Sequence, residues 1–367
     1  MSILTFAYLI GGFTLLVLGA EVLVRGAARL AASFGISPLI IGLTVVAFGT
    51  SAPEMAVSTQ SAFMGQGDIA IGNVIGSNIF NVLVVLGLSA LIIPLVVSRQ
   101  LVRFDVPIMI AAGFLAWFLA LDGSYSRIDG LILFSCIIVY TGYLIISSLK
   151  AFKAGKTLAS DDEYTADINP HRFASLINIA YLLIGLVLLV TGSNLLVTGA
   201  VSLAQALGLS ELVIGLTIIA VGTSLPELAT SLIAAWKGER DIAVGNIVGS
   251  NLFNLLAVLG LAGLASPENI AVARSAIEFD FPVMMAVMVA CLPVFFAGYS
   301  INRWEGALFL GYYVAYTAYL IMQSNGEPFA NTFADAMFGY VVPLTAITLF
   351  VIAARAWRIQ RGLSVDH

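Results

Sequence analysis

The sequence predicts an all-α membrane protein: a polytopic helix bundle of two inverted five-helix repeats with one extra C-terminal helix. Three observations support this fold class. Of 367 residues, 60% are apolar and only 10% are charged, against about 25% charged in a soluble domain. Eleven apolar segments are long enough to cross a bilayer, and two motifs recur at one constant offset. The composition excludes a secreted disulfide scaffold, a disordered chain and an ordinary cytosolic enzyme.

The candidate spans follow one another along the whole chain. A membrane-crossing helix needs about 20 mostly apolar residues. The first segment has no basic stretch before it, so we expect a first span and not a cleaved signal peptide. The predicted spans are residues 3–32, 38–64, 70–97, 105–121, 128–149, 173–206, 212–236, 242–265, 279–298, 304–322 and 336–354.

The distribution of basic residues predicts the orientation. If the N-terminus lies outside, 14 of the 16 basic residues fall on the cytoplasmic side, and only Arg127 and Arg274 fall outside. Cytoplasmic loops carry an excess of Lys and Arg in membrane proteins. We therefore expect a multi-pass protein of the cell membrane with a cytoplasmic C-terminus.

Two internal similarities indicate a duplicated unit. Residues 36–54 and 209–227 are identical at 12 of 19 positions, and residues 68–81 and 241–254 at ten of 14, both with an offset of 173. Each unit contains five spans, and an odd number of spans inverts the second copy in the membrane. The predicted division is a first repeat over 1–150, a cytoplasmic linker over 151–172, a second repeat over 173–323, and an extra span with a basic tail over 324–367.

The motifs GTSAPE (Gly49–Glu54) and GTSLPE (Gly222–Glu227) each lie near the middle of an apolar span. Pro53 and Pro226 lack an N–H group, so each removes one helical hydrogen bond and favours a break in the helix. Backbone freed at this depth is tolerated only against protein or a water-filled cavity. Carbonyl, hydroxyl and carboxylate oxygens gathered there suit a hard cation. The side chains concerned are Thr50, Ser51, Glu54, Thr223, Ser224 and Glu227.

Glu54 and Glu227 are the strongest functional signals in the sequence. Glu54 precedes the next loop, at Asp68, by 14 residues, or roughly 21 Å of helix, which is too far for its side chain to reach water. A charge at the bilayer centre costs at least about 2.5–3.5 kcal/mol. A protonated or structurally hydrogen-bonded glutamate is the alternative, but the feature occurs twice at repeat-related positions.

The motifs GNVIGSNIFN and GNIVGSNLFN place further polar groups in the following spans. Ser77 and Asn81 are four residues apart and share one helix face, as do Ser250 and Asn254. The glycines of each motif have GxxxG spacing, for which close helix packing is the simpler explanation. Packing does not account for the polar side chains beside them. We therefore expect these faces to meet the glutamate-bearing helices around a common site.

Other polar residues within spans suggest structural roles. Glu21 and Arg25 are spaced for an ion pair on one helix, although a role in an ion pathway stays open. Asp105 and Asp280 each precede a proline by two residues, so they are expected to cap the helices that begin there.

The paired GTSxPE and GSN-(I/L)-FN motifs resemble the two alpha-repeats of the calcium/cation antiporter superfamily, especially prokaryotic sodium/calcium exchangers. The resemblance covers about residues 1–323. It implies a cluster of cation sites used alternately by Ca²⁺ and Na⁺. The implied ligands are the carboxylates of Glu54 and Glu227, the hydroxyls of Ser51, Ser77, Ser224 and Ser250, the backbone oxygens of Ala47, Thr50, Ala220 and Thr223, and the side chain of Asn81.

Asn254 departs from the pattern of this family. Exchangers of this type often carry Asp in the second repeat, whereas this chain has Asn254, the counterpart of Asn81. The implied site therefore holds two formal negative charges, which match one Ca²⁺ or two Na⁺.

Together these features predict a secondary active antiporter that exchanges Ca²⁺ for Na⁺ by alternating access. A Ca²⁺/H⁺ antiporter on the same fold is the nearest alternative, and a cation channel is the alternative of another class. The residue pattern argues against an enzyme, a cofactor or nucleic-acid binding. The expected partners are the lipid bilayer and the transported ions, with a monomer capable of transport and an oligomeric state left open.

Overall fold

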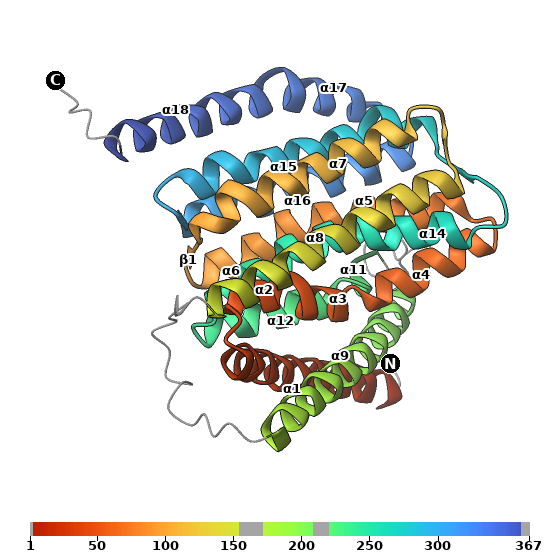
Figure 1. Cartoon of the computed structure of the whole chain (residues 1–367). Helices are drawn as coiled ribbons and strands as arrows, with labels where there is room; N and C mark the ends of the chain where they lie inside the picture. Colours follow the sequence, from red (N-terminus) through yellow and green to blue (C-terminus); the bar gives the residue numbers. More distant parts are fainter. Residues whose placement is uncertain (1–2, 154–171, 208–219, 361–367) are drawn as a thin grey trace.

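The computed structural model describes residues 3–153, 172–207 and 220–360. Within these ranges the chain is almost entirely helical (Figure 1). Three predicted segments lie partly outside the described residues: the linker over 151–172 at 154–171, the span over 212–236 at 212–219, and the basic tail at 361–367.

The first half of the chain forms a series of helices, several of which contain a π-helical turn. The helices are α1 (Ile3–Phe34), α2 (Pro38–Ile41), α3 (Ala47–Thr50), α4 (Ala52–Phe63), α5 (Gly67–Phe80), α6 (Gly87–Ile92), α7 (Val106–Ala120) and α8 (Arg127–Lys153). The π-helical turns are η1 (Gly42–Val46), η2 (Asn81–Leu86) and η3 (Leu101–Asp105).

The second half repeats this order and adds helices at its end. The helices are α9 (Arg172–Ala206), α11 (Ala220–Gly222), α12 (Leu225–Trp236), α13 (Arg240–Leu252), α14 (Leu259–Ala265), α15 (Phe281–Phe296), α16 (Arg303–Ser324), α17 (Phe329–Ala336) and α18 (Val342–Gln360). The π-helical turns are η6 (Phe253–Val258), η7 (Ala276–Asp280) and η8 (Met337–Val341).

Eight helices in the described part of the chain are long and apolar enough to cross a membrane. A ninth candidate is the bent pair Pro38–Thr50 and Ala52–Phe63. The predicted segment 304–322 corresponds to the 22-residue helix α16. The membrane class of the fold is therefore confirmed, while the count of ten spans plus one stays a prediction.

Two pairs of very short strands, which the all-helical prediction did not include, join the loops of the two halves. β1 (Leu95–Val96) pairs with β4 (Ser300–Ile301), and β2 (Ser124–Tyr125) pairs with β3 (Ile270–Ala271), both antiparallel. Each pair therefore ties a loop of the first half to a loop of the second.

Helices α1 and α9 pack closely along one side of the bundle (Figure 1). Glycines at intervals of seven allow the close approach. A Cβ atom added at Gly19 would lie 2.7 Å from the backbone nitrogen of Leu189, and one at Gly192 would lie 2.6 Å from that of Leu16. Small residues bring membrane helices together in this way. The central helices α5, η2, α13 and η6 form the most buried part of the bundle.

Candidate cation-binding site

The helix carrying the first GTSxPE motif is broken at the predicted place. Helix α3 ends at Thr50, α4 starts at Ala52, and the two are bent by 47°. Pro53 occupies the first turn of α4, where its missing N–H leaves no helical bond unmade. Ser51 lies at the break with φ −80° and ψ 6°, and Ser224 between α11 and α12 has nearly the same angles, −89° and 6°.

The two breaks are joined by reciprocal hydrogen bonds between the halves of the chain. The Ser224 hydroxyl donates to Glu54 Oε1 at 2.8 Å, and the Ser51 hydroxyl donates to Glu227 Oε1 at 3.0 Å. Both glutamates and both serines are 0% exposed. Each carboxylate is therefore held by a hydroxyl from the other half, and each half contributes one carboxylate to a shared polar centre.

Asn73 and Asn246 extend this network, and the sequence prediction missed them. Asn73 Nδ2 donates to the Glu54 carbonyl at 3.3 Å, while its Oδ1 accepts from the Thr223 hydroxyl at 3.2 Å. Asn246 Nδ2 donates to the Glu227 carbonyl at 3.5 Å, and its Oδ1 accepts from the Thr50 hydroxyl at 3.1 Å. Each asparagine thus fastens the backbone of one glutamate to the threonine of the opposite break.

A serine one turn beyond each glutamate completes these clamps. Asn73 Nδ2 lies 2.9 Å from Ser58 Oγ, and Asn246 Nδ2 lies 3.0 Å from Ser231 Oγ. Both asparagines and both serines are related by the offset of 173. Their identity at equivalent positions marks them as part of the duplicated motif, but it does not distinguish them from the other asparagines of that motif, which recur in the same way.

Buried polar atoms without a hydrogen-bond partner gather on the predicted ligands. Thirteen such atoms occur in the described part of the chain, and seven belong to predicted site residues. Buried polar groups in proteins are almost always paired, so each exception calls for an explanation. The seven atoms are Glu54 Oε2, Ser77 Oγ, Asn81 Oδ1 and Nδ2, Glu227 Oε2, and Asn254 Oδ1 and Nδ2.

The helices that carry the predicted amide ligands pack across the two halves. The turn η2, which begins at Asn81, contacts α12 and α13, and η6, which contains Asn254, contacts α4 and α5. Asn81 thus lies on an element packed against the Glu227 helix, and Asn254 on one packed against the Glu54 helix. A π-helical turn inside a helix often marks a functional site. The elements that carry Asn81 and Asn254 are thus packed against the glutamate helices, while the meeting of their polar faces at a common site stays a prediction.

Ser250 and Ala47, two of the remaining predicted ligands, have partners within the protein. Ser250 Oγ lies 3.3 Å from the Thr50 hydroxyl. The Ala47 carbonyl accepts the backbone N–H of Ser51 at 3.0 Å. The Gly222 carbonyl, at the end of α11, accepts the Ser193 hydroxyl of α9 at 2.6 Å. Ala220 begins α11 directly before the second break.

The oxygen set favours a hard cation over a transition metal. Residues 3–153, 172–207 and 220–360 contain no group of three or more His, Cys, Asp and Glu side chains placed to hold a metal. The centre instead combines two carboxylates with hydroxyl and amide oxygens, the ligand types of Ca²⁺ and other hard cations. The residues present therefore fit a small hard cation with a charge near +2.

Glu21 lies apart from this centre. Its Oε1 accepts from Arg25 at 2.9 Å, which confirms the predicted ion pair, and also from Lys237 at 2.7 Å. Its side chain is 37% exposed, in contrast to Glu54 and Glu227. The prediction did not include Lys237, which follows α12 and links that helix to α1.

The predicted helix caps at Asp105 and Asp280 are wrong. Neither side chain makes a capping hydrogen bond, because π-helical turns extend both helices by about one turn toward the N-terminus. Asp105 instead accepts from the Tyr140 hydroxyl at 2.9 Å, and Asp280 accepts from the Tyr316 hydroxyl at 3.1 Å. The two carboxylates thus fasten α7 to α8 and α15 to α16.

Similarity to known proteins agrees with this geometry. The chain is 32% identical over 356 residues to the sodium/calcium exchanger MaX1 of Methanosarcina acetivorans, covering 87% of this chain and 99% of that protein. It is 41% identical over 324 residues to the putative antiporter CaxA of Alkalimonas amylolytica, covering 86% of this chain and 98% of the relative.

A solved structure shares the fold. The sodium-calcium exchanger NCX_Mj, soaked with zero Na⁺ and Ca²⁺, is 33% identical with a TM-score of 0.73, covering 87% of this chain and 100% of that one. The family described as sodium/calcium exchanger protein matches residues 4–147 and 177–322. These ranges contain both broken helices, both glutamates and both asparagine clamps. The chain therefore belongs to the sodium/calcium exchanger family of membrane antiporters.

Proposed function

We propose that this protein is a secondary active antiporter that moves Ca²⁺ in exchange for Na⁺, with Glu54 and Glu227 as the shared cation ligands. The observation that carries the proposal is the pair of buried carboxylates. Each has one oxygen held by a serine of the other half and one oxygen without a partner among the described residues. A bound cation between the two free oxygens would satisfy both.

The charge of the site sets the load that it holds. With Asn254 in place of an acidic residue, the centre carries two formal negative charges. One Ca²⁺ or two Na⁺ neutralise it, whereas a third Na⁺ would add an uncompensated charge in a medium of low dielectric constant. We therefore propose that the Ca²⁺ load and the Na⁺ load carry equal charge, so that exchange is insensitive to membrane voltage.

The duplicated halves support alternating access. Inverted repeats form many secondary transporters, with the substrate site where the repeats meet. Here equivalent residues of the two repeats differ in exposure. Val57 on α4 is 38% exposed, whereas its equivalent Thr230 on α12 is 0% exposed. Helix α1 packs against α12. Two copies of one unit in unlike surroundings are what a transporter open to one side requires. The pair α1 and α9 is the element proposed to move between the two arrangements.

The predicted topology gives the direction of transport. With ten spans in two inverted repeats and the N-terminus outside, as the distribution of basic residues predicts, we propose that the protein lies in the cell membrane with its basic ends in the cytoplasm. A Na⁺ gradient directed inward would then drive Ca²⁺ out of the cell. The match to MaX1 covers 99% of that protein, which is named a sodium/calcium exchanger. This similarity favours Na⁺ as the counter-ion.

Uptake of ⁴⁵Ca²⁺ into proteoliposomes tests the proposal. Vesicles loaded with Na⁺ and diluted into Na⁺-free medium should accumulate ⁴⁵Ca²⁺, while vesicles with an equal outward proton gradient and no Na⁺ should not. Both arms are run with K⁺ and valinomycin so that the voltage is fixed. Uptake driven by the proton gradient alone would instead support a Ca²⁺/H⁺ antiporter. Passive Ca²⁺ flux without any counter-ion would support a channel.

A further inference from the structure

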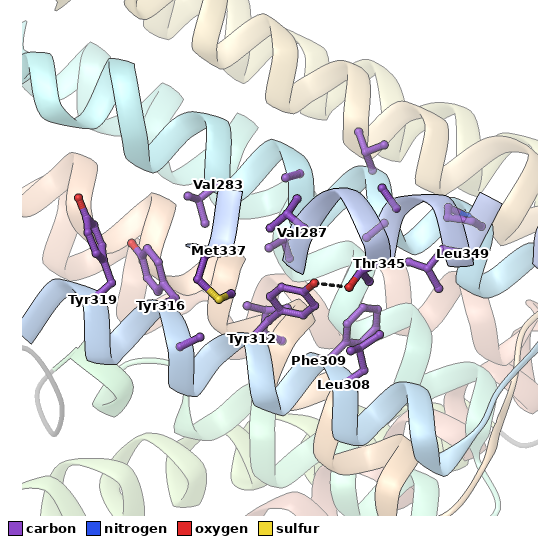
Figure 2. Close-up of a pocket in the computed structure, with 18 of the residues that line it drawn as sticks. Val283, Val287, Leu308, Phe309, Tyr312, Tyr316, Tyr319, Met337, Thr345 and Leu349 are labelled. Carbon is purple, nitrogen blue, oxygen red and sulfur yellow. Dashed lines mark hydrogen bonds between the residues drawn. The ribbon is translucent and has the colours of Figure 1, made fainter. Parts of the chain in front are cut away.

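A long apolar slot lies between the extra C-terminal helix and the body of the protein. Its volume is about 560 Å³, and its walls come from η7 and α15, from α16, and from α17, η8 and α18. Figure 2 shows Val283 and Val287 of α15, Tyr312 of α16 and Leu349 of α18 around this space. Tyr312 and Thr345, which both line the slot, are joined by a hydrogen bond that the Tyr312 hydroxyl donates. The family match ends at residue 322, so one wall of the slot lies outside the shared region.

The slot is long enough for an acyl chain of one leaflet. Its lining runs along the α15 side from Phe279 to Pro293, or about 21 Å at 1.5 Å per residue. A length of about 21 Å exceeds half of the 30 Å hydrocarbon core, which one leaflet's chains fill.

The placement of the slot specifies its surroundings. Both α15 and α18 belong to candidate membrane spans, and only 6% of the residues in the most apolar stretch of Thr332–Ile352 are buried. Helices in a bilayer associate through packing, because the lipid around them is as apolar as they are. An unfilled slot would leave its lining without contact atoms. A lipid chain would supply the missing contacts between α18 and α15.

The charges beyond the two ends of the slot differ in sign. Arg355 and Arg358 are exposed and follow Phe350, the last lining residue of α18, by five and eight residues. Arg303, also exposed, precedes Leu308 on α16 by five. At the opposite end lie the exposed acids Glu278, Glu327 and Asp335, with Arg274 paired to Glu278 at 2.6 Å. Basic groups beside membrane helices bind anionic lipid headgroups.

We propose that this slot binds one acyl chain of an anionic phospholipid, whose phosphate lies among Arg303, Arg355 and Arg358. The lipid fills the space between α18 and the helices α15 and α16, and so fastens the extra helix to the exchanger body. The site is distinct from the cation centre, and its occupation does not depend on which ion is exchanged.

Native mass spectrometry of the delipidated, full-length protein tests this site. The probes are phosphatidylglycerol and phosphatidylcholine with identical acyl chains. We expect one phosphatidylglycerol per chain, bound about 30-fold more tightly than phosphatidylcholine. Arg355 and Arg358 supply most of the attraction, because Arg303 already donates to the Ile92 carbonyl. Equal retention of the two lipids by the wild-type protein would overturn the proposal.

Matched variants separate the slot from the surface around it. Ala346→Trp fills the slot and should abolish retention of phosphatidylglycerol, whereas Ile347→Trp, on the next position and outside the lining, should keep it. Arg355→Gln with Arg358→Gln leaves the slot unchanged and should lower phosphatidylglycerol binding to the level of phosphatidylcholine. Unchanged binding in either the Ala346→Trp variant or the double arginine variant would refute the site. A dimer that Ala346→Trp dissociates would show an interface between copies instead.

Discussion

Replacing Ser224 by Ala removes one of the two hydrogen bonds that join the halves at the cation centre. The serine hydroxyl donates to Glu54 Oε1 at 2.8 Å in a fully buried setting. A hydrogen bond to a charged group contributes about 1.5–3 kcal/mol. The hydroxyl orients the carboxylate so that Oε2 stays free for the ion. Ca²⁺ affinity should therefore fall by a factor of about 10–150.

Isothermal titration of the purified protein with Ca²⁺ measures this loss. The symmetric change Ser51→Ala removes the matching bond to Glu227, at 3.0 Å, and should weaken binding by a similar factor. Ser33→Ala is the control, because its hydroxyl only donates to the Leu30 carbonyl within α1. If both site variants bind Ca²⁺ within about threefold of the wild type, the hydroxyls do not position the carboxylates and the reasoning is wrong.

Three further outcomes follow from the same structure. Asn246→Leu breaks the clamp between the Glu227 backbone and the Thr50 hydroxyl. Ca²⁺ affinity in the same titration should therefore fall about tenfold, because one hydrogen bond contributes about 1.4 kcal/mol. An unchanged affinity would show that the clamp is dispensable. Gly19→Ala places a Cβ atom 2.7 Å from the backbone of α9. In denaturant unfolding this variant should be less stable than the wild type by about 1–3 kcal/mol. Gly11→Ala is the control and should not be destabilised, because no atom lies within 4 Å of its added Cβ. Asn254→Asp adds a third carboxylate, so Na⁺-driven ⁴⁵Ca²⁺ uptake should become sensitive to a voltage set with valinomycin; uptake that stays voltage-independent would contradict the charge balance.

Much of the site could be predicted because its residues recur in two motifs. The proline and glycine of each GTSxPE segment predict a break from local chemistry alone, and the structure places the break at Ser51. The cost of a carboxylate at membrane depth, together with its recurrence at repeat-related positions, is enough to single out Glu54 and Glu227. These inferences use only the local sequence around each residue and the constant offset between the two repeats.

The clamps escaped prediction because their partners lie in the other half of the chain. Asn73 binds Thr223, 150 residues away, and Asn246 binds Thr50 at a distance of 196 residues. A buried asparagine has several donors and acceptors, and spacing within one helix does not say which of them is used. The serine and asparagine on the neighbouring face are the more obvious candidates, so the pattern alone does not separate the clamp residues from the rest of the motif.

The two-residue strands and the aspartates show a second limit. β1 and β4 lie about two hundred residues apart and are too short to give any alternating pattern. Asp105 and Asp280 precede a proline, which is a sound cap signal in a regular helix. In the structure a π-helical turn precedes each of these helices, so the helix begins before the aspartate. A tyrosine of the next helix donates a hydrogen bond to each aspartate carboxylate.

Ca²⁺ binding by the neutral glutamine variants tests the central claim most directly. Glu54→Gln and Glu227→Gln keep the shape of each side chain and remove one of the two negative charges of the centre. Isothermal titration should show Ca²⁺ binding lost in both, while Glu21→Gln, which removes a membrane-helix acid paired with Arg25 and Lys237, should still bind Ca²⁺. Ca²⁺ binding of wild-type strength in both Glu54→Gln and Glu227→Gln would contradict the assignment of the site.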